Sequence, residues 1–142
     1  MTRADLEAEL RRELGQRAEA DAITRSLGYL TSWWVVGPFD NEGRAGFTRE
    51  LPPETTPVGD IDVERPFDGK ERPVRWRRMP AVSTQGYVPL DAAVRPSVNA
   101  CAFAATTLQS PRAEAAVLWL GATGAVAAVV NGVPVYGDSA VR

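Results

Sequence analysis

The stretch Ser32-Trp33-Trp34-Val35-Val36, followed directly by Gly37-Pro38, decides the fold of this chain. Aromatic and β-branched residues favour a pleated, half-buried strand, and Gly-Pro is a strong turn signal. We therefore expect a strand that stops at Gly37-Pro38 and a β domain that begins at Tyr29. Adjacent residues of a strand point to opposite faces. One tryptophan should pack inward, while the other covers the preceding segment or faces a ligand.

Residues 1–28 have a different pattern, which predicts a helical leader. Thr2 and Asp5 have the spacing of a capping pair, and Gly28 is a natural helix end. Gly15 either separates two short helices or bends one, and both alternatives stay open. One helical face carries leucines at four-residue intervals, and we expect it to pack on the β domain. These leucines are Leu6, Leu10 and Leu14.

Residues 29–142 are expected to form an antiparallel β-sandwich. Gly and Pro punctuate residues 40–73, which predicts a wrapping loop with short strands near Phe47 and Ile61. Asn131-Gly132 predicts a hairpin, because a type I′ turn needs positive φ at both central residues. Further strands are expected at 74–79 with Val74 and Trp76 inward, at 86–91, at 99–108 and at 115–120, the last two being central.

Several classes of catalytic site cannot be built from this chain. Histidine is absent and Cys101 is the single cysteine, which excludes Ser-His-Asp and Cys-His systems and zinc sites of His or paired Cys. We expect Cys101 to be a buried, inert thiol. Carboxylates for glycoside hydrolysis exist only in loop-like sequence, so we predict no catalytic residue and no enzyme. They are Glu54, Asp60, Asp62 and Asp91.

The length and charge of the chain limit the kinds of partner that it can bind. A chain of 142 residues is the size of one domain plus an appendage. Its net charge of −2 argues against a nucleic-acid partner, and no apolar run is long enough for a membrane span. Residues 1–15 are acidic and lack the apolar core of a secretion signal. We therefore expect a cytoplasmic location for the chain as written, and export of a larger parent protein stays open.

A series of short motifs resembles one known family. It starts with Trp33-Trp34-Val35-Val36-Gly37-Pro38-Phe39-Asp40-Asn41 and continues in the family's order with Gly46-Phe47, Pro52-Pro53-Glu54, Phe67-Asp68-Gly69-Lys70, Val74-Arg75-Trp76, Leu118-Trp119-Leu120-Gly121 and Asn131-Gly132. Together these motifs span roughly residues 29–136. They are similar to the jelly-roll, galactose-binding-like module next to helical, tetratricopeptide-like repeats and transglutaminase-like domains in large bacterial proteins.

The resemblance implies a jelly-roll-like β-sandwich that acts as an accessory module without catalysis. Relatives place an aromatic or polar residue just before Asn-Gly, where this chain has Ala127-Ala128-Val129-Val130. That departure removes one expected sugar-stacking position. Relatives also continue past the hairpin into a further strand, whereas this chain stops at Arg142. We therefore expect the sandwich to lack its last strand unless another chain supplies it.

Aromatic and amide side chains are the candidate ligand contacts, although burial in the core is the stronger interpretation for the rings. The candidates are Trp33, Trp34, Phe39, Asn41, Trp76 and Asn131. Asp40, Asn41 and Glu42 offer oxygen ligands for a structural calcium ion, but their spacing better fits a turn that caps backbone amides. We predict no cofactor. Arginines around Trp76 are expected to form a solvated, ion-paired strand face.

Two functions from different classes follow. The first is a noncatalytic accessory interaction module, carbohydrate-binding-like or protein-docking. The alternative is a structural protein that oligomerises through its helical leader and an exposed sheet edge, because unpaired edges attract strands from other chains. Both imply a protein partner or self-association.

Overall fold

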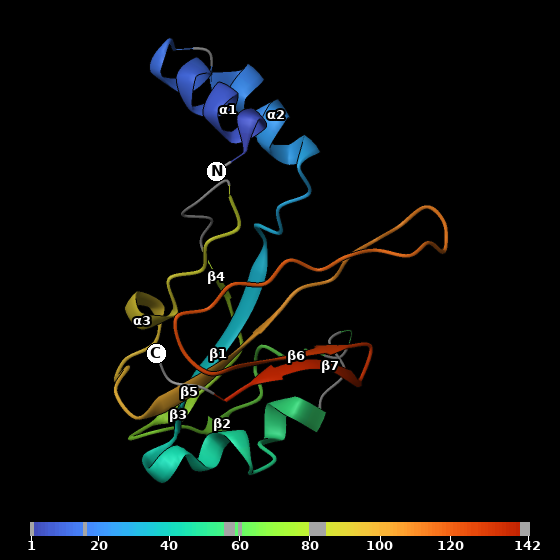
Figure 1. Cartoon of the computed structure of the whole chain (residues 1–142). Coiled ribbons are helices and arrows are strands. Elements are labelled where there is room, and N and C mark those ends of the chain that lie inside the picture. Colours follow the sequence, from blue (N-terminus) through green and yellow to red (C-terminus); the bar gives the residue numbers. More distant parts are fainter. Residues whose placement is uncertain (1, 16, 56–58, 60, 80–84, 140–142) are drawn as a thin grey trace.

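The computed structural model describes residues 2–15, 17–55, 59, 61–79 and 85–139. It is a β-rich fold of small antiparallel sheets with a helical hairpin at one end (Figure 1). The helices are α1 (Arg3–Glu13), α2 (Arg17–Ser26), η1 (Glu42–Phe47), η2 (Pro52–Thr55) and α3 (Leu90–Ala93). The strands are β1 (Trp33–Asp40), β2 (Phe67–Asp68), β3 (Pro73–Val74), β4 (Arg77–Met79), β5 (Ala100–Ala105), β6 (Val126–Val130) and β7 (Val133–Asp138).

The start of α1 is the capping box that the sequence predicts. The hydroxyl of Thr2 accepts a hydrogen bond from the Asp5 amide at 3.1 Å, and the Asp5 carboxylate accepts one from the Thr2 amide at 2.9 Å. These bonds satisfy amides that have no partner within the helix. Gly15 has a φ of +77° and divides the leader into two helices, so the structure selects one of the two open alternatives.

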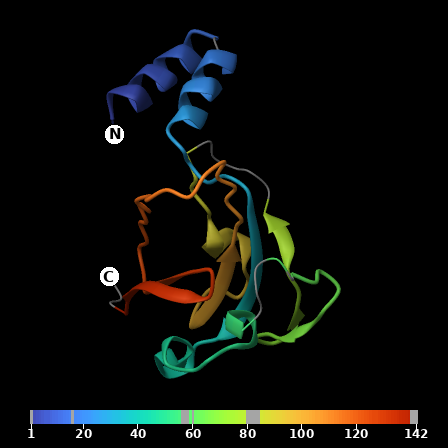
Figure 2. The same cartoon turned by 90° about the vertical axis from the view of Figure 1, so that its right-hand side faces the viewer.

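The predicted packing of the leucine face on the β domain is wrong. Those three leucines on α1 are each more than half exposed, whereas Ala8 of α1 and Ala20 of α2 are fully buried. The two helices pack against each other, and small side chains at buried positions let helices approach closely. The helical hairpin stands at the end of the β body in both views (Figures 1 and 2). The Tyr29 hydroxyl joins it to the chain that follows by donating to Asp5 at 3.2 Å.

Strand β1 is the centre of the main sheet, whose order is β4-β1-β5. It does not stop at Gly37-Pro38 as the sequence predicts, but runs on to Asp40. An irregularity between Val36 and Phe39 shifts the register against β5, and such bulges accommodate a proline within a ladder. Gly37 has a φ of +150°, and a Cβ there would lie 2.9 Å from the Cβ of Ala102. Only glycine fits at this point, where β1 passes close to β5.

One apolar cluster holds β1, the β2–β3 pair and the residue that precedes η2 together. Phe39 lies at its centre and makes edge-to-face contacts with Phe67 and Phe103 at ring-centroid distances of 6.3 and 5.6 Å. The predicted inward orientation of Val74 and Trp76 is confirmed, because both are buried. The buried members of the cluster are Val36, Phe39, Leu51, Phe67, Val74 and Trp76.

Several predicted strands are absent from the described residues. The strand expected near Phe47 is the 3₁₀ helix η1, and Ile61 lies outside any strand. Residues 86–91 lead into α3 instead of forming a strand, since the N–H groups of Ala92 and Ala93 bond back to the Pro89 carbonyl. The expected strand at 74–79 is divided between β3 and β4. Dense Gly and Pro punctuation favours turns over ladders here.

The hairpin of β6 and β7 is confirmed, with positive φ at Asn131 (49°) and Gly132 (80°). The prediction of a strand at 115–120 is wrong. Residues 106–125, which we call the arm, contain no strand and leave β5, run outward and return to β6 (Figure 1). All residues from 107 to 123 are exposed. Apolar composition alone therefore did not bring this segment into the core.

Candidate functional site

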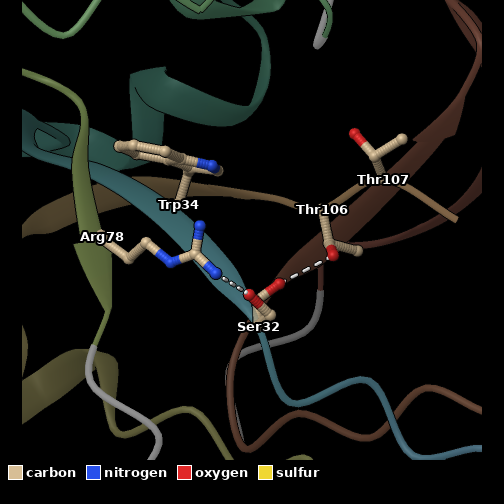
Figure 3. A pocket seen from close by; sticks show the side chains of 5 residues that line it. All are labelled: Ser32, Trp34, Arg78, Thr106 and Thr107. Carbon is tan, nitrogen blue, oxygen red and sulfur yellow. Dashed lines mark hydrogen bonds between the residues drawn. The ribbon is translucent and has the colours of Figure 1, made fainter.

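A small hollow lies beside Trp34 near the start of β1 (Figure 3). The Arg78 guanidinium donates to the Ser32 hydroxyl at 2.7 Å, and its central carbon lies 5.6 Å from the Trp34 ring centroid. The Thr106 hydroxyl donates to the Ser32 carbonyl, also at 2.7 Å. With Thr107, these side chains enclose about 170 Å³. The hollow thus combines an aromatic face, a cation and hydroxyl groups.

The size of this hollow limits what it can hold. Sites for drug-sized ligands usually measure about 300–1,000 Å³. The guanidinium of Arg78 also lies over the Trp34 ring, where a stacked sugar would otherwise lie. Only a small polar group fits without movement of Arg78.

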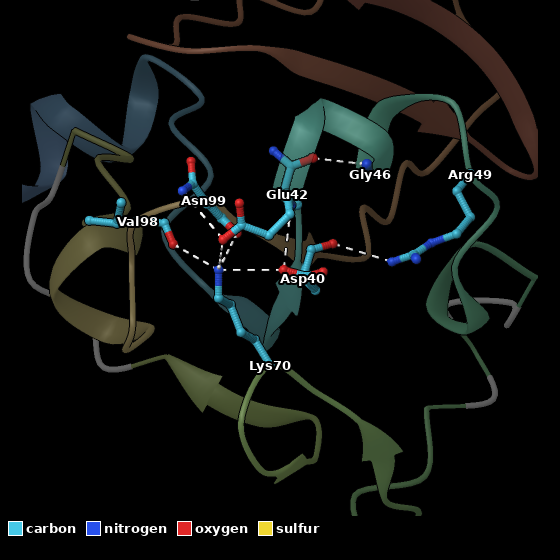
Figure 4. Close-up of polar contacts among 8 residues, drawn as sticks. Asp40, Glu42, Gly46, Arg49, Lys70, Val98 and Asn99 are labelled. Atoms are coloured by element: carbon cyan, nitrogen blue, oxygen red, sulfur yellow. Dashed lines mark hydrogen bonds and ion pairs between the residues drawn. The ribbon is translucent and has the colours of Figure 1, made fainter.

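A second polar cluster surrounds Lys70 (Figure 4). Its ammonium donates to the carbonyls of Asn99 at 2.7 Å and Val98 at 3.2 Å, and lies 3.4 and 3.3 Å from the carboxylates of Asp40 and Glu42. Burial acts to lower the pKa of Lys70, but bonds and charge from Glu42 and Asp40 outweigh it and raise that pKa above its ordinary value. The cluster ties the β2–β3 connection to the start of β5.

The oxygens proposed for calcium are engaged by the protein itself. The Asn41 side-chain oxygen accepts a hydrogen bond from the Gly46 amide at 2.8 Å, and Asp40 accepts one from the Glu42 amide at 3.4 Å. Lys70 lies beside both carboxylates, where a bound cation would be. Among the described residues, no group of three Asp, Glu, Cys or His side chains could hold a metal ion.

The aromatic candidates are spread across the fold. Phe39 and Trp76 belong to the core cluster. Trp33 donates its indole N–H to the Leu30 carbonyl at 2.8 Å. Asn131 lies in the β6–β7 turn, away from β1 along the chain. The structure therefore brings one of the six candidates, Trp34, into a hollow with other polar groups.

The carboxylates considered for catalysis each support a local turn. Glu54 accepts a hydrogen bond from the Leu51 amide at 3.0 Å, Asp62 from the Glu64 amide at 2.9 Å, and Asp91 from its neighbour Ala92 at 3.0 Å. Asp60 lies outside the described residues. The Cys101 thiol is half-buried, and burial raises its pKa, which disfavours the reactive thiolate.

Comparison with known proteins gives no relative. No protein-family model, curated protein or solved structure matches the chain. The family resemblance of residues 29–136 therefore stays a prediction. No helix in the described part of the chain is long and apolar enough to cross a membrane.

The largest feature that the sequence did not predict is an exposed apolar surface. The arm and the β6–β7 hairpin together carry ten large apolar side chains, each between 47% and 92% exposed. We call this set the arm–hairpin surface: Leu108, Val117, Leu118, Trp119, Leu120, Val129, Val130, Val133, Val135 and Tyr136. Sequence reasoning placed 115–120 in the core because a continuous apolar run is typical of a central strand.

The hairpin makes only a shallow contact with the rest of the body. A hollow of about 350 Å³ separates its turn from η1 and η2. Gly137 of β7 approaches Phe47 of η1, where an added Cβ would lie 3.9 Å from the ring. The residues around the hollow are Phe47, Thr48, Arg49, Glu50, Glu54, Val129, Gly132 and Pro134.

Proposed function

We propose that this chain is a noncatalytic interaction module that docks a protein partner through its arm–hairpin surface. The exposure of its ten large apolar side chains carries the proposal. Two of the ten, Trp119 and Tyr136, are aromatic, and a ring of this kind has about 150–250 Å² of surface to bury. Single exposed apolar side chains are normal on a monomer, but a gathering of them on two adjoining segments is typical of an interaction site.

The hairpin supports the same proposal independently. Strands β6 and β7 form a two-stranded sheet of their own, and Val133 through Gly137 are all exposed. Such a hairpin is at best marginally stable in water, because no third strand joins it in the described part of the chain. Figure 2 shows the arm running directly into this hairpin on one side of the body. A partner that covers both would order them together.

The jelly-roll assignment is part of this proposal. The antiparallel pairings of β1 with β4 and β5, and of β6 with β7, are compatible with pieces of a galactose-binding-like sandwich. In a complete fold of this kind the arm and hairpin would belong to strands packed against the main sheet. In this chain their side chains are exposed, so we assign the covering surface to a partner.

Photo-crosslinking of the full chain in its native cells tests the docking function. A photoreactive residue replaces Trp119 on the arm and, in a matched control, Glu9 on the exposed side of α1. We expect a discrete adduct from position 119 and none from position 9. Val117→Asp in the position-119 protein should abolish the adduct. Equal labelling from both positions, or no adduct from position 119, would contradict the proposal.

A carbohydrate ligand is the second candidate, and it requires Arg78 to move away from the Trp34 ring, which it covers. The indole would then be open for stacking, and the Ser32 and Thr106 hydroxyls beside it for hydrogen bonding. Saturation-transfer NMR with a panel of monosaccharides should detect contact with one sugar class. Trp34→Ala should remove it, whereas Tyr87→Ala, at an exposed ring elsewhere, should not. Equal saturation transfer in wild type and Trp34→Ala would eliminate this candidate.

A further inference from the structure

We propose that the partner of the arm–hairpin surface is a second copy of this chain, and that two copies exchange arms. In this arrangement, residues 115–120 of each copy add as a strand to the free edge of β5 in the other. The inference rests on the proposed docking function and names its partner.

Strand β5 supplies one half of the contact. It ends the sheet order β4-β1-β5, so one side pairs with β1 and the other is a sheet edge in the described part of the chain. In an antiparallel ladder, alternate residues direct their N–H and C=O groups away from the neighbour. The sequence Ala100-Cys101-Ala102-Phe103-Ala104-Ala105 contains no Lys, Pro or charge to block an incoming strand. Five of the six side chains are Ala or Cys, which are small and leave the backbone accessible.

The arm supplies the other half. Residues 115–120, Ala-Ala-Val-Leu-Trp-Leu, form an uncharged run whose length of six residues equals that of β5. Val117 and Trp119 are 80% and 92% exposed, and the segment belongs to no strand. An exposed, uncharged apolar segment without Pro or Gly can pair with an open edge. Each copy therefore carries an unpaired strand-forming run and an edge that can accept it.

Charge and reciprocity both favour a second copy. From 106 to 136 the only charged residues are Arg112 and Glu114, which pair with each other at 3.2 Å. Two such surfaces do not repel one another. Each exchanged segment brings four exposed large apolar side chains to the contact, namely Val117, Leu118, Trp119 and Leu120. Reciprocal exchange is a closed two-fold contact, so association stops at the dimer.

Complementation between two variants tests the exchange, with light scattering after size-exclusion chromatography as the readout of mass. Wild type should be a dimer that dissociates on dilution. Trp119→Asp damages the arm, and Ala104→Lys places a charge on β5 at an exposed position. Each variant alone should raise the dissociation constant at least tenfold. Their equimolar mixture should recover dimer, because one arm and one β5 edge in the pair remain intact.

The outcomes separate this inference from the function on which it rests. Circular dichroism of each variant should match wild type, and Leu10→Asp on α1 serves as the control outside the surface. A mixture that stays monomeric, or a dimer that Leu10→Asp disrupts, would overturn the arm exchange. A monomeric wild type with a foreign protein crosslinked at position 119 would overturn the second copy but keep the docking function. A monomeric wild type without any crosslink would contradict both the arm exchange and the docking function.

Discussion

Lys70 donates from its ammonium group to the carbonyl of Asn99 over 2.7 Å, although the two residues are 29 positions apart in the chain. Its side chain is only 15% exposed, and the carboxylates of Asp40 and Glu42 lie on the same ammonium. This contact fixes the start of β5 against the loop between β2 and β3. A single lysine therefore connects parts of the fold that no continuous sheet joins.

Replacing this lysine should destabilise the protein in a pH-dependent way. Lys70→Met removes the bonds to Asn99 and Val98, and we expect the unfolding midpoint to fall by a few degrees at neutral pH. The pKa of Lys70 is raised above 10.5, so its contribution is present below pH 10.5 and is lost as pH rises through the folded-state value. Thermal melts of both proteins should therefore converge at high pH. Arg72→Met, at an exposed neighbour, is the control, and an equal drop in it would contradict this role.

The capping carboxylate of α1 should give an acid-sensitive helical hairpin. Hydrogen bonds from the amide and hydroxyl of Thr2, and a weaker one from Tyr29, lower the pKa of Asp5 below 3.8 in spite of burial. The stabilisation is thus present above pH 3.8 and is lost as pH falls through the folded-state value. Helicity, followed by circular dichroism, should fall over this acidic pH range by more in the wild type than in Asp5→Asn. Identical acid profiles of the two proteins would show that the cap carries no charge-dependent stability.

A methyl group at Gly37 should be among the most damaging small changes. Gly37→Ala places a Cβ 2.9 Å from the Cβ of Ala102 at a φ of +150°, so β1 and β5 must separate or the backbone must change. We expect a loss of about 2 kcal/mol or more in chemical denaturation. Gly121→Ala is the matched control, because nothing lies within 4 Å of its Cβ position. Its stability should stay within about 0.5 kcal/mol of wild type. Similar losses in both variants would refute the steric argument.

Local signals predicted most of the regular elements. The capping pair Thr2 and Asp5 and the turn Asn131-Gly132 act through bonds and dihedral angles within a few residues, so one sequence is enough to find them. The inward positions of Val74 and Trp76 followed from alternation in the same way. The extension of β1 past Gly37-Pro38 could not be predicted from local signals. It depends on the close approach of β5, which lies about 60 residues later.

Burial was harder to predict than secondary structure. The leucines of α1 and the run 115–120 have the apolar patterns of packed elements, yet both are exposed. Hydrophobicity gives the tendency of a segment to be covered, but it does not say which element covers it. For the candidate site, sequence reasoning found Trp34 but not its approach by Arg78, since that contact crosses from β1 to β4.

Substitutions at Trp76 should separate the contribution of packing to stability from that of hydrogen bonding in the core. Its side chain is 5% exposed, and its indole nitrogen is buried without a hydrogen-bond partner among the described residues. Trp76→Ala should cost about 3–5 kcal/mol, because it leaves a large cavity beside Phe39 and Val74. Trp76→Phe should cost less than about 1.5 kcal/mol, since removal of an unpaired buried donor offsets part of the lost contact. Urea denaturation of the three proteins measures both differences. If Trp76→Phe were as damaging as Trp76→Ala, the indole N–H would have a partner that stabilises the fold.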